Sequence, residues 1–360
     1  MIRPMHELLN RLGLSLPIFQ APMAGTATPE MAAAVSESGG LGSVGLASAG
    51  PDGAKTMIEA IRSASNRPFN VNLFCHRPAQ ADPERESAWI GRMRPVFEGF
   101  GAEPPETLRE INTSFLVDEA MLDVLLEQRP PVISFHLGLP RPEQVQALKK
   151  TGAILIASAT SLAEGEAAVA SGMDAVVAQG YEAGGHRGIF EPDGEDTRLG
   201  TFALTRLLVA KLPVPVIAAG GIMDGAGISA ALQLGAIAAQ LGTAFIGCPE
   251  SAADEGYRKA LQSDAAYHTE MIASISGRPA RCLANRFTVF AAELGEAIPD
   301  YPIAYDAAKA LNAAAKAAGE TGFGPQWAGQ GAPLARPMPA AELVARLGEE
   351  FRVADATSRP

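Results

Sequence analysis

The chain has 360 residues, of which 47% are hydrophobic and 19% charged, a composition typical of a large globular protein rather than a disordered one. Its formal net charge of −11 leaves no cationic excess for binding phosphates along a strand, so we expect no nucleic-acid partner. Cys75, Cys248 and Cys282 are an odd number without a CxxC pair, which argues against a disulfide framework or a zinc site.

Eight short apolar runs recur along the chain, and each is followed by a turn. Parallel strands that are buried on both faces are expected to read as continuous apolar runs of this kind. The predicted strands are Pro17–Gln20, Leu41–Val44, Phe69–Leu73, Val132–His136, Ile154–Ala157, Ala175–Ala178, Val214–Ala218 and Ala236–Leu241. An open doubly wound sheet usually has fewer strands, so the pattern favours a closed (β/α)8 TIM barrel.

Helical patterns alternate with these strands. They lie at Glu30–Ser38, Ala54–Ser65, Pro142–Lys150, Leu162–Ser171, Leu204–Lys211 and Gly225–Leu234. We expect residues 1–75 and 128–250 to form the barrel, and residues 76–127 and 251–339 to form a helical cap. Further helical patterns in these insertions lie at Asp118–Glu127, Ser251–Gln262 and Ile303–Ala318. A last helix, residues 340–352, is expected to pack on the barrel.

No stretch approaches the apolar length of a membrane helix, so we expect no membrane partner. The odd cysteine count favours a reducing compartment, and the expected location is the cytoplasm. Whether the chain forms a homodimer stays open.

Polar and glycine residues follow the predicted strands, where a barrel places its ligand site. Gly220 and Gly221 follow the seventh strand, and Gly242 and Thr243 follow the eighth. Barrels often bind phosphate between these two loops through backbone N–H groups. The sequence therefore predicts a phosphate site there.

Two side-chain amides, Asn72 and Gln179, lie on predicted strands or just past them. Their donor and acceptor atoms would suit the pyrimidine edge of a flavin ring. For either residue alone, an amide that bonds a loop backbone is an equally good interpretation.

His186 is the candidate catalytic residue, because it follows two glycines and its imidazole can titrate near neutrality. His136 also ends a predicted strand, where a hydrogen-bonded wall residue is a slightly better interpretation than a direct chemical role. Tyr301, Tyr305 and Lys309 are spaced i, i+4 and i+8, which places them on one face of a helix. That stripe fits core packing and an anion-attracting substrate wall equally well.

Six segments together resemble the nitronate monooxygenase family. They are QAPMAG (20–25), NVNLF (70–74), SFHLG (134–138), QGYEAGGHRG (179–188), AAGGI (218–222) and QLGTAF (240–245). QGYEAGGHRG is the most specific of them, and the tyrosine–lysine stripe resembles a feature of the class I members. The resemblance implies an FMN-containing barrel that oxidises alkyl nitronates with O₂ to a carbonyl compound and nitrite, without a metal.

The same resemblance implies roles for individual residues. His186 matches the catalytic base, and His136, Tyr301, Tyr305 and Lys309 are expected in the substrate pocket. The expected FMN contacts are Ala21, Pro22, Met23, Asn72, Gln179, Gly184, Gly185, Gly220, Gly221, Gln240, Leu241, Gly242 and Thr243. Whether neutral nitroalkanes are also substrates stays open.

Two other functions remain as alternatives. FMN-dependent NADH:quinone reductases and enoyl-acyl-carrier-protein reductases share much of this scaffold, including the EAGGH element at residues 182–186. A protein that binds a phosphate-containing ligand without turnover belongs to a different class. His186 and the polar strand ends make that second alternative the weakest of the three.

Overall fold

Eight parallel strands form the centre of the computed structural model, which describes residues 6–295 and 297–357. They are β1 (Ile18–Gln20), β2 (Gly42–Gly45), β3 (Phe69–Phe74), β4 (Val132–His136), β5 (Ile154–Ala159), β6 (Ala175–Gln179), β8 (Val216–Ala219) and β9 (Ala238–Leu241). Their order in the sheet is β1-β9-β8-β6-β5-β4-β3-β2. A parallel bridge between Phe19 and Leu41 joins the two edges. The predicted (β/α)8 barrel is therefore confirmed.

The strand register brings the candidate amides to one end of the barrel. Asn72 pairs with Ser134 between β3 and β4, and Gln179 pairs with Ala219 between β6 and β8. Ala219 also pairs with Gln240 of β9. Because parallel strands all end on the same side, these side chains can reach one cavity.

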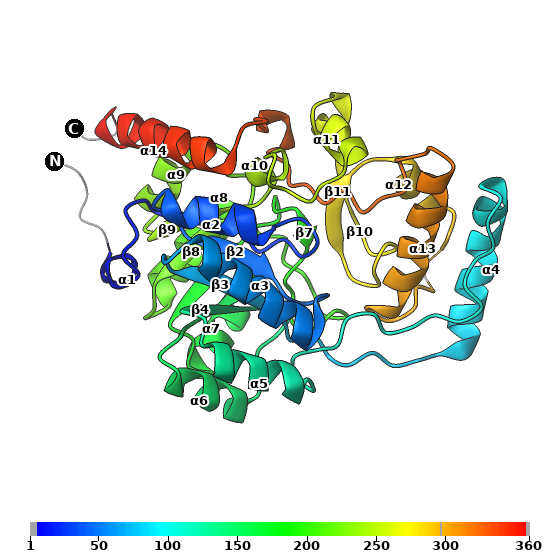
Figure 1. The fold of residues 1–360 in the computed structure, drawn as a ribbon, viewed down its shortest axis with the longest axis horizontal. Helices are drawn as coiled ribbons and strands as arrows, with labels where there is room; N and C mark the ends of the chain where they lie inside the picture. The colour runs from blue at the N-terminus through cyan, green and yellow to red at the C-terminus, as the bar shows by residue number, and fades with distance from the viewer. Residues whose placement is uncertain (1–5, 296, 358–360) are drawn as a thin grey trace.

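Helices surround the barrel, and most begin and end within a few residues of the predicted bounds (Figure 1). They are α1 (Glu7–Arg11), α2 (Pro29–Glu37), α3 (Gly50–Ala64), α5 (Glu119–Gln128), α6 (Pro142–Lys150), α7 (Leu162–Ala170), α8 (Thr201–Lys211), α9 (Gly225–Gln233), α10 (Thr243–Ile246) and α14 (Ala340–Thr357). Helix α3 begins four residues before the predicted Ala54, because Pro51 is accommodated in its first turn. Helix α14 ends five residues beyond the predicted residue 352.

Two of these helices clarify the domain boundary. Met121 and Leu125 of α5 are buried in the same hydrophobic cluster as residues of the strands and of α3, so α5 is part of the barrel wall. The cap insertion therefore ends before α5, rather than at residue 127. Leu343 and Leu347 of α14 are buried in the cluster that contains Ile18 of β1, so this helix also lies on the barrel.

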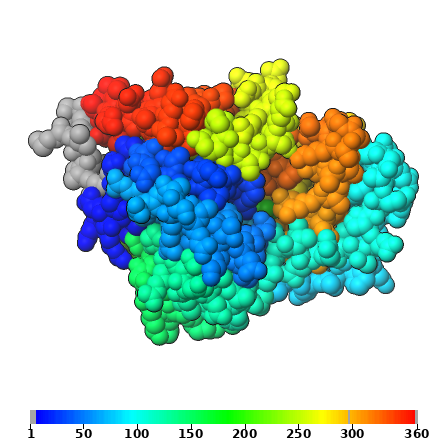
Figure 2. Space-filling view, viewed as in Figure 1, coloured from blue at the N-terminus to red at the C-terminus, as the bar shows by residue number. Residues whose placement is uncertain are grey.

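The cap lies at one end of the barrel and combines helices with a small sheet (Figures 1 and 2). Its helices are α4 (Pro83–Gly99), α11 (Glu255–Leu261), α12 (Arg286–Ala291) and α13 (Ile303–Ala317), with 3₁₀ turns at Asp264–Tyr267 and Ala332–Leu334. The antiparallel strands β10 (Thr269–Ile272) and β11 (Ala280–Leu283) continue to β7 (Gly185–His186), which leaves the barrel after β6. The predicted helical cap therefore also contains a small sheet, which has no local signal because its strands pair only across long stretches of sequence.

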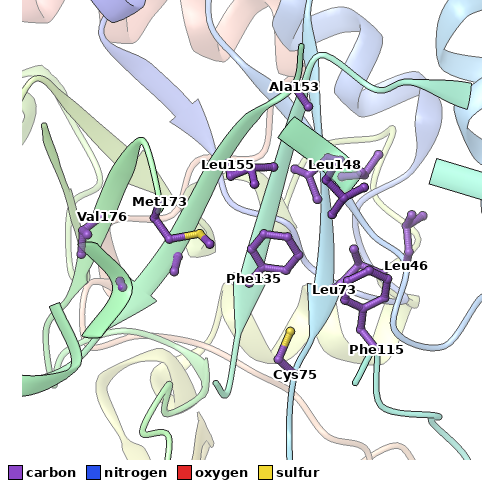
Figure 3. Close-up of a cluster of buried hydrophobic side chains, with 14 of the residues drawn as sticks. Leu46, Leu73, Cys75, Phe115, Phe135, Leu148, Ala153, Leu155, Met173 and Val176 are labelled. Atoms are coloured by element: carbon purple, nitrogen blue, oxygen red, sulfur yellow. The ribbon is translucent and has the colours of Figure 1, made fainter. Parts of the chain in front are cut away.

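Three of the five hydrophobic clusters among the described residues each contain one free cysteine. Cys75 lies in the layer between the strands and the helices on one side of the barrel (Figure 3). Cys248 lies in the cluster under α14. Cys282 lies in the cap cluster, with Trp89 of α4 and Leu311 of α13. No described helix is long and apolar enough to cross a membrane.

Candidate functional site

One cavity of about 260 Å³ opens at the carboxyl ends of the strands, beneath the cap. It is many times larger than the ~15 Å³ that a single water molecule needs. Every candidate site residue named from the sequence lines it, except Leu241. The Leu241 side chain is instead buried in the cluster under α14, and its carbonyl oxygen accepts a hydrogen bond from the Ala21 N–H.

The residues that line this cavity are unusual in charge for an acidic protein. None of the described residues lining it is an aspartate or a glutamate, and Lys309 is the one lysine or arginine among them. In the chain as a whole, acidic residues outnumber lysine and arginine by 40 to 29. Because no carboxylate opposes an incoming anion, the cavity favours negatively charged ligands.

The glycine turns after β8 and β9 form one wall. Gly220 and Gly221 have φ angles of 122° and 69°, which strain any residue with a side chain. A Cβ on Gly220 would lie 2.5 Å from Thr201 Oγ1, so close packing also requires glycine here. Thr243 Oγ1 accepts a hydrogen bond from the Gly329 N–H at 2.9 Å, which leaves its own proton free for a ligand.

The two candidate amides have different partners. Gln179 holds the loop after β6, since its Nε2 donates to the His186 carbonyl and its Oε1 accepts from the Gly188 N–H. Asn72 Nδ2 donates to Ser134 Oγ at 2.9 Å. Both side chains line the cavity, and Gln179 keeps one Nε2 hydrogen and one lone pair for a ligand.

His186 is placed by strand β7, which enters the cap sheet and pairs with Ala280 of β11. The preceding Gly185 has a φ of 73°, a conformation that glycine adopts without strain and that turns the chain toward the cavity. His186 Nε2 lies 2.9 Å from Ser276 Oγ. Burial, followed by the nearby His136 and Arg278, lowers the pKa of His186 to about 3. The ring is therefore neutral at pH 7 and can accept a proton.

His136 at the end of β4 is hydrogen-bonded on both ring nitrogens. Its Nε2 lies 3.0 Å from the His186 carbonyl oxygen, and its Nδ1 contacts Ser158 Oγ. A carbonyl can only accept, so Nε2 carries the proton and Nδ1 accepts one from Ser158. Burial lowers the pKa of His136 to about 4, which keeps this neutral tautomer at pH 7. His136 therefore anchors the backbone at His186.

An aromatic wall faces His186 from the cap. Tyr305 is on α13, whereas Tyr301 precedes that helix, so the predicted single helical stripe is wrong for Tyr301. Both nevertheless approach the imidazole, with ring centroids 5.3 Å (Tyr301) and 6.3 Å (Tyr305) away. Lys309 Nζ lies 4.8 Å from the Tyr305 ring centroid, at the exposed end of this wall. Burial raises the pKa of Tyr305 to about 12, so its phenol stays protonated at pH 7.

Sequence reasoning missed three residues around the His186 ring. Trp327 lies 5.3 Å from His186 between ring centroids, Phe74 lies 5.9 Å away, and Ser276 bonds the imidazole. Phe74 directly follows the predicted third strand, as the other candidate residues follow theirs. Its position could therefore have identified it as a site residue. Trp327 lies in a Gly/Pro-rich loop and Ser276 in a cap turn, and neither position has a local pattern that indicates a site.

Comparison with known proteins gives consistent matches over nearly the whole chain. The nitronate monooxygenase family model matches residues 6–350. A nitronate monooxygenase from Paraburkholderia phytofirmans is 58% identical over 96% of this chain and 95% of its own length. Another from Pseudomonas aeruginosa is 54% identical over 95% and 97%, respectively.

Solved structures give the same picture at lower sequence identity. A nitroalkane oxidase from Streptomyces ansochromogenes superimposes with a TM-score of 0.90 at 36% identity, covering 98% of this chain and 100% of its own. FabK from Thermotoga maritima superimposes with a TM-score of 0.74 at 28% identity, covering 99% and 98%. The same barrel and cap arrangement is therefore shared by proteins with different names.

Proposed function

This chain belongs to the nitronate monooxygenase family, and we propose that it uses FMN to oxidise alkyl nitronates with O₂, forming a carbonyl compound and nitrite. The observation that carries the proposal is the composition of the cavity. It has no carboxylate among its described lining residues, and a lysine and a neutral histidine stand at its aromatic wall. A nitronate is an anion, and this cavity suits it.

The cavity fits FMN at both ends. Gly220, Gly221 and Gly242 leave room for a phosphate, and the free Thr243 proton can donate to one of its oxygens. Asn72, Gln179 and the backbone of residues 21–23 line the same cavity and would hold the ring. When bound, FMN would take electrons from the substrate and pass them to O₂.

The protein's own contribution is to bind, orient and exchange a proton. Lys309 and the phenols of Tyr301 and Tyr305 would attract the nitro group of the anion and hold it against the aromatic wall. A preformed nitronate needs no base. A neutral nitroalkane must first lose its α-proton, and His186 is the neutral imidazole in position to accept it.

The decisive experiment is anaerobic. The purified holoprotein is mixed with either an alkyl nitronate or NADH, and bleaching of the flavin absorbance is followed. We expect the nitronate to bleach the flavin and NADH to leave it oxidised. Bleaching by NADH alone would replace the proposal with a reductase activity, and bleaching by neither would favour a protein that only binds a phosphate-containing ligand.

A further inference from the structure

A short turn in the cap, Ser276–Gly277–Arg278, packs directly behind His186. Ser276 is fully buried, and its Oγ lies 2.9 Å from His186 Nε2. Gly277 has a φ of 96°, and a Cβ on it would lie 2.7 Å from the Pro299 carbonyl oxygen and the Tyr301 nitrogen. The turn therefore requires glycine, and its close packing fixes Ser276 relative to the imidazole.

The hydrogen bonds of Ser276 favour one tautomer of the neutral His186 ring. Ser276 Oγ also lies 3.2 Å from the Arg278 carbonyl oxygen, which can only accept. If the single hydroxyl proton is donated there, Ser276 Oγ must accept a proton from His186 Nε2. In the neutral ring Nδ1 then carries the lone pair. Nδ1 makes no hydrogen bond to another described residue, and His186 lines the cavity.

Arg278 places a positive charge behind the same ring. Its side chain is 2% exposed, and its guanidinium donates to the carbonyl oxygens of Leu137, Ile189 and Phe190. Its Nε has no hydrogen-bond partner, and no carboxylate of the described chain lies within ion-pair distance of it. The carboxylates of Glu191 and Asp300 act on this charge only from beyond ion-pair distance. The buried charge therefore still acts on neighbouring groups, because little water screens it.

We propose that this turn is the positioning element of His186: Ser276 holds the proton on Nε2, so Nδ1 faces the substrate as the base, and Arg278 fixes a permanent positive charge behind the ring. Both residues act through His186, so neither needs to touch the substrate. The inference rests on the proposed function only for the use of the base. The tautomer and the charge state can be measured without turnover.

Other groups around His186 contribute to its charge state. The titratable and charged groups that face it from neighbouring elements are His76, His136, Arg278, Tyr301, Tyr305 and Lys309. Among them His136, Arg278 and His76 add to burial, the largest effect, in lowering the pKa of His186. Arg278 is the one permanent cation that contributes. Its removal should therefore raise the pKa of His186, whereas its replacement by lysine should not.

The first test is nuclear magnetic resonance of the ¹⁵N-histidine-labelled holoprotein at pH 7, with His186 assigned from its absence in His186→Asn. We expect a slowly exchanging ring proton on Nε2 in the wild type. Ser276→Ala should lose this protected proton, and Ser276→Thr should keep it. A ring proton on Nδ1 in the wild type, or an unchanged protected proton in Ser276→Ala, would overturn the assignment to Ser276.

The second test follows the ¹⁵N shifts of His186 against pH in Arg278→Met and Arg278→Lys. We expect the midpoint to move up in Arg278→Met and to stay near the wild-type position in Arg278→Lys. Arg281→Met is the matched control, because Arg281 is equally buried but stacks on Tyr181, 4.9 Å from its ring centroid. Equal shifts in the methionine variants of Arg278 and Arg281 would refute a specific role for Arg278. If the His186 midpoints move as expected but the wild-type protein does not turn over a nitronate, the proposed function alone is contradicted.

Discussion

The imidazole of His186 and the phenol of Tyr301 meet edge to face, with ring centroids 5.3 Å apart and planes at 76°. The Tyr301 ring also meets the His76 ring, with centroids 4.8 Å apart and planes at 90°. One tyrosine ring thus contacts two histidines. Aromatic contacts from the cap and a hydrogen bond with Ser276 hold the His186 ring in place. A fixed ring suits a base that must remove a proton from one particular carbon atom.

Replacing His186 with asparagine should separate base catalysis from pocket lining. A neutral nitroalkane needs proton removal, and a positioned general base contributes about 10²–10⁴-fold, so turnover of this substrate should fall by that factor. Turnover of the preformed nitronate should fall much less. Steady-state kinetics with each substrate at equal FMN content measures the difference. An equal fall for both substrates would show that His186 is not the base.

Lys309→Met should raise the KM for an anionic nitronate and leave FMN content unchanged. Lys309 stands at the cavity wall, so its loss removes the charge that attracts the anion. Lys316→Met on the same helix is the control, since Lys316 pairs with Asp254 at 2.6 Å away from the cavity. Unchanged kinetics in Lys309→Met together with lower thermal stability would support a packing role instead.

Thr243→Val should weaken FMN binding. A hydrogen bond to a charged group contributes about 1.5–3 kcal/mol, so the Kd should rise about 10- to 100-fold in fluorescence titration of the apoprotein. Thr205→Val makes the same substitution at a buried threonine on α8 whose hydroxyl has no partner, and it should leave the Kd unchanged. A wild-type protein that is colourless and fails to bind added FMN would remove the cofactor proposal altogether.

Stability should fall with acidification below about pH 6.5. Burial lowers the pKa of His76 and His136 to about 4 and that of His186 to about 3. Between these values and the ordinary histidine pKa of 6.5, the unfolded chain binds protons that the folded chain excludes. Each histidine should therefore cost up to about 1.4 kcal/mol per pH unit as pH falls through that window.

Denaturant unfolding at several pH values measures this slope. His76→Phe should make it shallower, because one buried imidazole is removed while an aromatic ring remains against Tyr301. His268→Gln is the control, since His268 is exposed and its loss should leave the slope unchanged. The same slope in His76→Phe as in the wild type would refute the contribution of His76.

The barrel was predictable from sequence because its signal is local. Runs such as Ile154–Ala159 are apolar throughout, as buried parallel strands must be, and their ends mark the ligand site. The cap was much less predictable. Helix α4 is amphipathic only weakly, and Gly185–His186 becomes a strand only because Ala280 and Arg281 pair with it from nearly a hundred residues away.

The same distinction applies within the site. Thr243 and the paired glycines could be found by their positions after strands. Ser276 and Trp327 could not be found in this way, because only the folding of the cap brings them into contact with His186. Tyr301 shows the intermediate case. Its spacing from Tyr305 predicted the right wall, although the residue precedes the helix on which the spacing argument depended.

The three cysteines offer independent reporters of how the molecule opens. Burial raises the pKa of Cys75 well above its usual range and those of Cys248 and Cys282 to about 12, so the native thiols are protonated and unreactive. An alkylating reagent can modify each one only during an excursion that exposes it. The three cysteines lie in the barrel wall, under the last helix and in the cap. Alkylation rates of the individual cysteines, measured by mass spectrometry, would therefore show which region opens most often.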